Sequence, residues 1–263
     1  MLRLGLVGRD IGHSRSPHLH RRFLRGAGLA GDYQLFDCQT PAQADQVLQQ
    51  FADHQLDGLN VTTPFKLLAA QRFAADLPSA NTLAWRDGKP WATSTDGAGL
   101  VAALGDVPAG ARVLVLGAGG AARACVPVLA GQGLAVRVCA RNNATSAEIA
   151  ELSGCGHASW QDGAALADCD VVVHLTRFGH GGAAAPGADF GWLPWAAWAA
   201  RGAVVVDGVY AAAGLTALET IAASHHAAVR IGFGRRMLAA QAALSFALWT
   251  GIVADWRSAV EAA

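Results

Sequence analysis

Two kinds of apolar pattern alternate along the chain. Short runs rich in valine and leucine predict buried strands, and longer stretches with an apolar residue every three or four positions predict helices. In the first part of the chain, strands are predicted over 2–7, 33–37, 79–85 and 89–95, with a further strand that begins at 57 and turns at 64. Helices are predicted over 18–26, 41–51, 66–75 and 100–104.

A regular alternation of strands and helices follows the turn at 105–110. Strands are predicted over 113–116, 134–140, 170–174 and 203–207, and helices over 119–131, 144–152 and 232–249. This order is typical of an α/β fold whose second part is a nucleotide-binding sheet. The length of 263 residues is enough for two domains, each with its own core.

The composition limits the kinds of partner that the chain can bind. The chain has 20 lysines plus arginines and 20 aspartates plus glutamates, so its formal net charge is zero. This balance argues against a dedicated nucleic-acid or membrane-surface binder and favours a small-molecule ligand. The five cysteines are scattered without a Cys-x-x-Cys pair, which signals neither a disulfide framework nor a zinc site. With no signal peptide or membrane-spanning run, we expect a cytoplasmic protein.

The most specific local pattern is a glycine-rich turn after the strand at 113–116. Gly117, Gly119 and Ala122 form a variant of the dinucleotide-binding fingerprint, in which small residues let a pyrophosphate approach the backbone and a helix N-terminus. An ordinary glycine turn of an α/β domain is the alternative. Taken alone, the stretch therefore predicts a dinucleotide site without settling its chemistry.

The end of the next strand bears on the choice of dinucleotide. NAD-binding units place a carboxylate there, whereas this strand runs into Arg141 and Asn142. A guanidinium suits the additional 2′-phosphate of NADP, so we expect NADP as the cofactor. The arginine could instead stack on adenine, in which case NAD would also bind.

Lys66 and Asp96 are the candidate catalytic residues. Lys66 lies at the head of a predicted helix, where the helix dipole disfavours a cation unless the lysine is used or compensated. The alternative is an exposed lysine. Asp96 precedes an apolar helical pattern and either caps that helix or presents a carboxylate at the C-terminal edge of a sheet, where ligand sites of α/β proteins gather.

Polar residues near two helices are candidates for ligand binding. Ser14 and Ser16 lie just before a predicted helix and either cap it or bind a carboxylate. Gln241 is a lone amide on the apolar side of the last helix, among leucines 238, 244 and 248, and a buried amide needs hydrogen-bond partners.

Two features of the second part have a structural interpretation. Trp192, Trp195 and Trp198 recur at helical spacing and predict a packed helix face rather than a ligand platform. The stretch 183–189 is a candidate mobile loop.

Several blocks together resemble the shikimate dehydrogenase family. They are residues 12–17 (GHSRSP), 60–66 (NVTTPFK), 81–82 (NT), 94–97 (STDG) and 117–123 (GAGGAAR), and Met237 with Gln241. The blocks follow the order of the family and cover nearly the whole chain. The resemblance implies NADP-dependent, reversible reduction of 3-dehydroshikimate to shikimate.

The resemblance also implies a domain division and a set of roles. An N-terminal α/β substrate domain, residues 1–104, would be joined by the returning C-terminal helix in 237–263, and residues 105–236 would form a Rossmann-like NADP domain. Lys66 and Asp96 would be the acid/base pair. The expected substrate-binding residues are Ser14, Ser16, Thr62, Asn81, Tyr210 and Gln241, and the expected cofactor-binding residues are Gly117, Ala118, Gly119, Gly120, Ala121, Arg141, Asn142, Thr176 and Gly234.

The chain departs from the family pattern at several of these blocks. Ser94 replaces the usual asparagine, and 78–80 (PSA) replaces Gly-Ala-Val, which changes the expected polarity of the pocket. Thr145 lies where a second basic residue is common, which would weaken selectivity for NADP. His174 and Gly208 differ from the usual asparagine and methionine on the nicotinamide side, so turnover or substrate preference is expected to change.

Two alternatives to shikimate dehydrogenation with NADP stay open. An NAD-dependent quinate or quinate/shikimate dehydrogenase would use the same catalytic pair. A non-catalytic dinucleotide sensor would keep the fold, and the departures motivate this alternative, although Lys66 and Asp96 oppose it. We expect a monomer or homodimer with no metal, nucleic acid or membrane partner.

Overall fold

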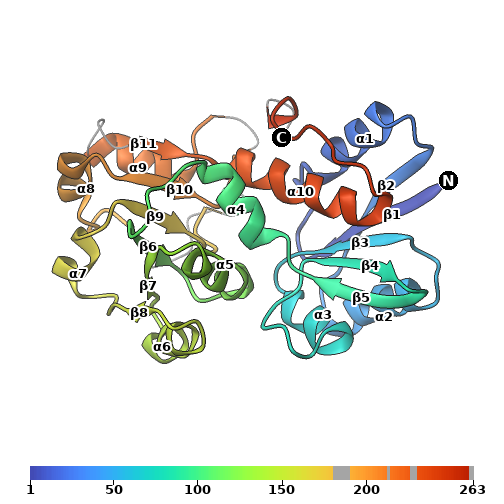
Figure 1. Cartoon of the computed structure of the whole chain (residues 1–263), viewed down its shortest axis with the longest axis horizontal. Helices are drawn as coiled ribbons and strands as arrows, with labels where there is room; N and C mark the ends of the chain where they lie inside the picture. The colour runs from blue at the N-terminus through green and yellow to red at the C-terminus, as the bar shows by residue number, and fades with distance from the viewer. Residues whose placement is uncertain (180–189, 212–213, 226–229, 261–263) are drawn as a thin grey trace. The chain divides into compact units, whose positions relative to one another are not determined.

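The computed structural model of the chain describes residues 1–179, 190–211, 214–225 and 230–260 (Figure 1). The chain divides into two compact units, of which the first comprises Met1–Ala102 with Arg235–Ala263 and the second comprises Ala103–Gly234. The breaks thus lie at 102/103 and 234/235, and the sequence placed the domain boundaries at 104/105 and 236/237.

The first unit contains a five-stranded sheet with the order β2-β1-β3-β4-β5. Its strands are β1 (Leu2–Gly8), β2 (Gly31–Asp37), β3 (Gly58–Val61), β4 (Thr82–Arg86) and β5 (Lys89–Thr93). β1 pairs in parallel with β2 and β3, whereas β4 pairs antiparallel with both β3 and β5. The parallel part brings the connections that follow β1 and β3 to the same edge of the sheet.

Helices cover both faces of this sheet. They are α1 (Ser16–Gly26), α2 (Pro41–Ala52), α3 (Lys66–Phe73), α4 (Asp96–Leu104) and α10 (Gly234–Thr250). One core joins β1 to α1 and α10 through residues such as Leu6, Phe23 and Phe246, and another joins β1 and β3 to α2 and α3. Figure 1 shows α1 and α10 on one side of the sheet and α2 and α3 on the other.

The second unit contains a six-stranded, wholly parallel sheet with the order β11-β10-β9-β6-β7-β8. Its strands are β6 (Arg112–Leu116), β7 (Ala135–Cys139), β8 (Gly156–His157), β9 (Val171–His174), β10 (Val204–Asp207) and β11 (Arg230–Gly232). The helices with described bounds are α5 (Gly120–Gly131), α6 (Asn143–Leu152), α7 (Gly163–Ala167), α8 (Trp195–Arg201) and α9 (Ala217–His225).

This strand order is that of a doubly wound, Rossmann-type sheet. The chain moves outward from β6 to β8 and then returns to β9 on the other side of β6, so the direction reverses between β6 and β9. Ligands of such sheets bind at this reversal, beyond the carboxyl ends of the strands. The predicted α/β fold with a Rossmann-like part is thereby confirmed.

Several predicted boundaries differ from the structure. α1 begins at Ser16 and α4 at Asp96, earlier than the apolar patterns predict, whereas the strand predicted from residue 79 begins at Thr82. The tryptophan face holds for Trp195 and Trp198, which are buried in α8 with ring centroids 5.1 Å apart. Trp192 precedes the helix and is exposed. The candidate loop at 183–189 lies outside the described residues.

Candidate active site

A buried ion pair joins the start of α3 to the start of α4. Lys66 Nζ donates to Asp96 Oδ2 at 2.5 Å, and the two residues are only 8% and 5% exposed. The interpretation of Lys66 as an exposed lysine is therefore wrong. The capping interpretation of Asp96 is also wrong, because this residue is the first of α4 and its carboxylate accepts from side chains of other elements.

Asn81 fixes the other side of the carboxylate. Its Nδ2 donates to Asp96 Oδ1 at 2.8 Å, and its Oδ1 accepts from the main-chain nitrogen of Thr95 at 2.8 Å. A main-chain N–H can only donate, so the amide orientation follows from this contact. Both carboxylate oxygens of Asp96 are thus held, one by a cation and one by an amide.

Gln241 on α10 completes this group. Its Oε1 accepts from Asn81 Nδ2 at 3.2 Å, and its Nε2 donates to the main-chain oxygen of Leu238 at 2.9 Å. α4 approaches α10 closely here, because a Cβ added to Gly99 would lie 2.7 Å from the Gln241 Cβ. The site therefore requires glycine at position 99.

The predicted surroundings of Gln241 need a correction. Leu244 and Leu248 are exposed, and the buried stripe of α10 consists of Ala239, Ala242, Ala243 and Phe246. Gln241 lies at the edge of this stripe and is partly buried. The small alanines let α10 pack close to the sheet. Leu244 and Leu248 were assigned to the wrong side, whereas Leu238 and Ala242 pack against this core as predicted.

A second layer of buried polar side chains lies behind Asn81. Asn60 Nδ2 donates to Thr82 Oγ1 and to Ser245 Oγ at 3.1 and 3.0 Å, and the two hydroxyl oxygens are 2.8 Å apart. Thr95 Oγ1 lies 3.2 Å from Ser245 Oγ. Sequence reasoning missed this layer, and its available signal was a lone serine on the apolar side of α10.

Ser14, Ser16 and Thr62 lie at the same edge of the sheet, after β1 and β3. The main-chain nitrogen of Ser16 donates to Ser14 Oγ at 3.2 Å, while the N-cap position of α1 is held by Arg15. Thr62 follows β3 and is half-buried. Among the described residues, no hydrogen bond joins these three side chains to the Lys66 group, so their binding role stays a prediction.

Gly117 and Gly119 form an open turn in the second unit. Gly117 has φ +124°, and a Cβ there would lie 2.8 Å from the main-chain oxygen of Leu175. Gly119 is the N-cap of α5, and a Cβ there would meet nothing within 4 Å. Within the described structure, no side chain caps α5 and no acidic residue lies in its first turn. The main-chain nitrogen of Gly117 donates to the main-chain oxygen of Cys139 at 2.8 Å. The N–H groups that follow it in this turn, from Ala118 to Ala121, therefore fit the pyrophosphate of a dinucleotide.

Arg141 and Asn142 follow β7 at the same edge. Arg141 is exposed, and Asn142 caps α6 by accepting from the main-chain nitrogen of Thr145 at 3.2 Å. Asn142 thus has a structural role, and its contact with a cofactor stays a prediction. Arg141 fits an anionic group beyond β7, since a guanidinium pairs well with phosphate oxygens.

Three other predicted site residues follow β9, β10 and β11 of the same sheet. Thr176 follows β9, and its hydroxyl oxygen lies 2.5 Å from His174 Nε2. A Cβ on Gly234 would lie 2.4 Å from the main-chain oxygen of Val209, so only glycine fits. Tyr210 follows β10 and belongs to the second unit, whereas the other predicted substrate residues belong to the first.

The departure at Gly208 has a steric reason. A Cβ there would lie 2.7 Å from the main-chain oxygen of His174, which also accepts from the main-chain nitrogen of Gly208 at 2.9 Å. The end of β9 therefore approaches the backbone after β10 too closely for a side chain at Gly208.

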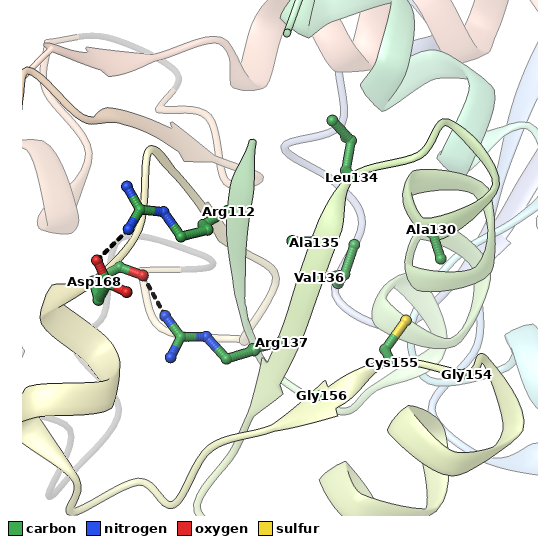
Figure 2. A pocket seen from close by; sticks show the side chains of 10 residues that line it. All are labelled: Arg112, Ala130, Leu134, Ala135, Val136, Arg137, Gly154, Cys155, Gly156 and Asp168. Atoms are coloured by element: carbon green, nitrogen blue, oxygen red, sulfur yellow. Dashed lines mark hydrogen bonds and ion pairs between the residues drawn. The ribbon is translucent and has the colours of Figure 1, made fainter. Parts of the chain in front are cut away.

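A cavity of about 460 Å³ lies at the opposite edge of this sheet, where β6, β7 and β8 begin (Figure 2). Arg112 donates to Asp168 and Asp170, and Arg137 donates to the main-chain oxygen of Asp168. Arg112 is thus held by ion pairs, and Arg137 is held by a hydrogen bond to a main-chain carbonyl oxygen. None of the predicted site residues lines this cavity, so we assign it no part in the site.

Metal sites and membrane-spanning helices can be looked for only among the described residues. These residues contain no cluster of histidine, cysteine, aspartate and glutamate that could hold a metal ion. None of their helices is long and apolar enough to cross a membrane.

Comparisons with known proteins agree on one family. Residues 6–82 match the family model described as the shikimate dehydrogenase substrate binding domain, and residues 234–263 match that of the shikimate 5′-dehydrogenase C-terminal domain. Shikimate dehydrogenase (NADP+) of Sinorhizobium fredii is 34% identical over 263 residues, which cover 94% of this chain and 88% of that protein. The enzyme of the same name from Halobacterium salinarum is 34% identical, with 98% of each chain covered.

Solved structures give the same result. The crystal structure of shikimate 5-dehydrogenase from Thermus thermophilus in complex with NADP(H) and shikimate superposes with a TM-score of 0.84 at 30% identity. The match covers 100% of this chain and 98% of that one. The chain belongs to the shikimate dehydrogenase family.

Proposed function

We propose that the protein catalyses the reversible, NADP-dependent reduction of 3-dehydroshikimate to shikimate, a reaction of aromatic amino acid biosynthesis. The observation that carries the proposal is the buried group of Lys66, Asp96 and Asn81. The similarity to NADP-dependent shikimate dehydrogenases along nearly the whole chain supports it.

The geometry suits Lys66 for proton transfer to a carbonyl oxygen. When hydride reaches the carbonyl carbon, negative charge develops on the oxygen, and an ammonium placed there stabilises and protonates it. Asp96 holds Nζ through Oδ2, and Asn81 holds Asp96 through Oδ1, so the direction of the ammonium is fixed. In the oxidative direction, neutral Lys66 accepts the hydroxyl proton. Bound NADPH supplies the hydride.

The first unit would bind the substrate. Gln241 and Asn81 place amide groups beside the catalytic pair, and the hydroxyls of Ser14, Ser16 and Thr62 lie at the same edge of the sheet, where they would bind a carboxylate and hydroxyls. Tyr210 would contribute from the second unit.

The second unit would bind NADP. The uncapped start of α5 would offer its N–H groups to the pyrophosphate, and the exposed guanidinium of Arg141, after β7, would bind the 2′-phosphate. Asn142, Thr176 and Gly234 would complete this site.

Initial rates with shikimate and quinate, each with NADP+ and NAD+, test the proposal. Shikimate with NADP+ is expected to give the highest kcat/KM. A tenfold preference for quinate with NAD+ would replace the proposal with a quinate dehydrogenase. No turnover of any of these substrates by protein that binds NADPH would make the chain a dinucleotide sensor.

The expected surroundings of the enzyme are part of this proposal. It would act in the cytoplasm as a monomer or homodimer, without nucleic acid or membrane. Light scattering after size-exclusion chromatography measures the oligomeric state, and a larger assembly would contradict it.

A further inference from the structure

A buried row of polar side chains connects the ends of β9 and β10. His174 Nδ1 lies 2.8 Å from Asp207 Oδ1, and its Nε2 lies 2.5 Å from Thr176 Oγ1. Thr216 Oγ1 donates to Asp207 Oδ2 at 2.5 Å. His174 is fully buried beside the rings of Phe178 and Phe190. None of these contacts belongs to the catalytic group of the first unit.

The proton on His174 is placed by Asp207. A carboxylate can only accept, so Nδ1 carries a hydrogen and donates to it. Asp207 also accepts from the main-chain nitrogen of Val209 at 3.0 Å, so three donors surround its carboxylate. In the neutral ring, Nε2 is then an acceptor.

This arrangement determines what the Thr176 hydroxyl can offer. Its one hydrogen is donated to His174 Nε2, and its oxygen accepts from the main-chain nitrogen of Phe178 at 3.1 Å. The remaining capacity of the oxygen is a single lone pair. Toward a ligand, Thr176 is therefore an acceptor and cannot donate.

Thr176 borders the glycine turn. A Cβ on Gly117 would lie 3.1 Å from the main-chain nitrogen of Thr176. β6, which leads into the turn, pairs with β7 on one side and with β9 on the other. With the pyrophosphate at the turn and the 2′-phosphate at Arg141 after β7, the nicotinamide half extends over the end of β9.

We propose that His174 is a positioning residue that turns the Thr176 hydroxyl into an acceptor for the carboxamide N–H of the nicotinamide ring. The inference rests on the proposed function, because it needs NADP in the second unit. The proposal gives a role to the histidine at position 174, where the family usually has asparagine. Through Thr176, His174 would favour a nicotinamide ring whose substituent can donate a hydrogen bond.

The test compares binding of NADP+ with that of its 3-acetylpyridine analogue, whose acetyl group has no N–H. Dissociation constants are measured by calorimetry on the full chain. One neutral hydrogen bond corresponds to roughly a three- to tenfold preference for the carboxamide. Thr176→Val is expected to remove this preference, and Thr176→Ser, which keeps the hydroxyl, is expected to retain it.

His174→Asn tests the positioning role itself. The shorter amide can still donate to Asp207 but does not reach Thr176, so the freed hydroxyl can donate to the acetyl oxygen. The preference is expected to fall at least threefold, toward that of Thr176→Val. Should this variant fail to fold, His174→Gln serves instead, because its amide oxygen can replace Nε2 as acceptor and must retain the preference.

Each result decides the inference. An unchanged preference in Thr176→Val or His174→Asn overturns it, as does a lost preference in His174→Gln. Failure of the proposed function can be distinguished from failure of this inference. If the wild-type protein prefers NADP+ over the analogue but turns over no cyclitol acid, only the proposed function is contradicted.

Discussion

Replacing His20 tests how burial in the first unit couples stability to pH. His20 on α1 is fully buried, and its ring stacks on Tyr33 with centroids 4.3 Å apart. Among the described residues, neither ring nitrogen has a hydrogen-bond partner of normal geometry. Burial lowers the pKa of His20 from 6.5 to about 3, and the nearby Asn60 counteracts this only in part.

The sign and size of the effect follow from linkage. The unfolded chain takes up a proton near pH 6.5 and the folded chain does not, so the stabilisation is complete above pH 6.5 and is lost as the pH falls toward 3. The loss approaches about 1.4 kcal/mol per pH unit, which gives about 1.4 kcal/mol at pH 5.5 and about 2 kcal/mol at pH 5.0.

Urea unfolding of wild type and His20→Phe at pH 7.5, 5.5 and 5.0 measures this loss. Phenylalanine keeps the aromatic stack and cannot be protonated, so the variant is expected to lose about 1.4 kcal/mol less than wild type between pH 7.5 and 5.5. Equal losses in the two proteins would refute the assignment to His20. The free energies are compared as differences between pH values, which removes any packing cost of the larger ring at neutral pH.

Three further predictions concern the two candidate binding regions. Lys66→Met is expected to lower kcat by about a thousandfold with a much smaller change in the Kd of shikimate, and an undiminished kcat would contradict its catalytic role. Arg141→Ala is expected to lower the ratio of kcat/KM for NADP+ over NAD+ by about 10- to 100-fold, and an unchanged ratio would mean that another group reads the 2′-phosphate. Gly117→Ala is expected to destabilise the fold by about 1–3 kcal/mol in urea unfolding, because of φ +124° and the contact with Leu175. Its matched control Gly119→Ala has free space around the added methyl group and should weaken NADP+ binding without loss of stability; equal stabilities of the two variants would contradict the steric argument.

The sequence predicts the central strands and helices well because their apolar patterns are long and are buried as expected. β1, β6 and α5 lie within one residue of the predicted bounds. β8 has two residues, both exposed, and β11 has three, so neither contains a pattern to detect. Such short edge strands are determined by pairing with a neighbour, which is a tertiary effect.

The residues of the candidate site likewise divide into those that the local sequence indicates and those that depend on tertiary contacts. Lys66 could be predicted because a cation at a helix start disobeys a local preference. Asp96 obeys the preference for an acidic residue there, so its position at the C-terminal edge of a sheet and the resemblance to the family singled it out. Asn60 and Ser245 could not be predicted, because their hydrogen bond joins residues 185 positions apart and forms only when α10 packs on the sheet. Asn60 does not differ locally from an ordinary polar side chain, and Ser245, although it is a lone serine on the apolar side of α10, gives no sign of which residue it contacts.

The helix α10 therefore helps to determine the geometry of the catalytic group, although Lys66, Asp96 and Asn81 all lie within the first hundred residues. Gln241 accepts from the same Asn81 amide that holds Asp96, and Ser245, one turn later, contacts Thr82 and Thr95 on either side of that amide. An unsatisfied buried amide or hydroxyl costs about 1–3 kcal/mol, so these contacts restrict Asn81 to one orientation. Because Asp96 Oδ1 follows that orientation, the direction of the Lys66 ammonium depends on α10, although neither charged residue belongs to it.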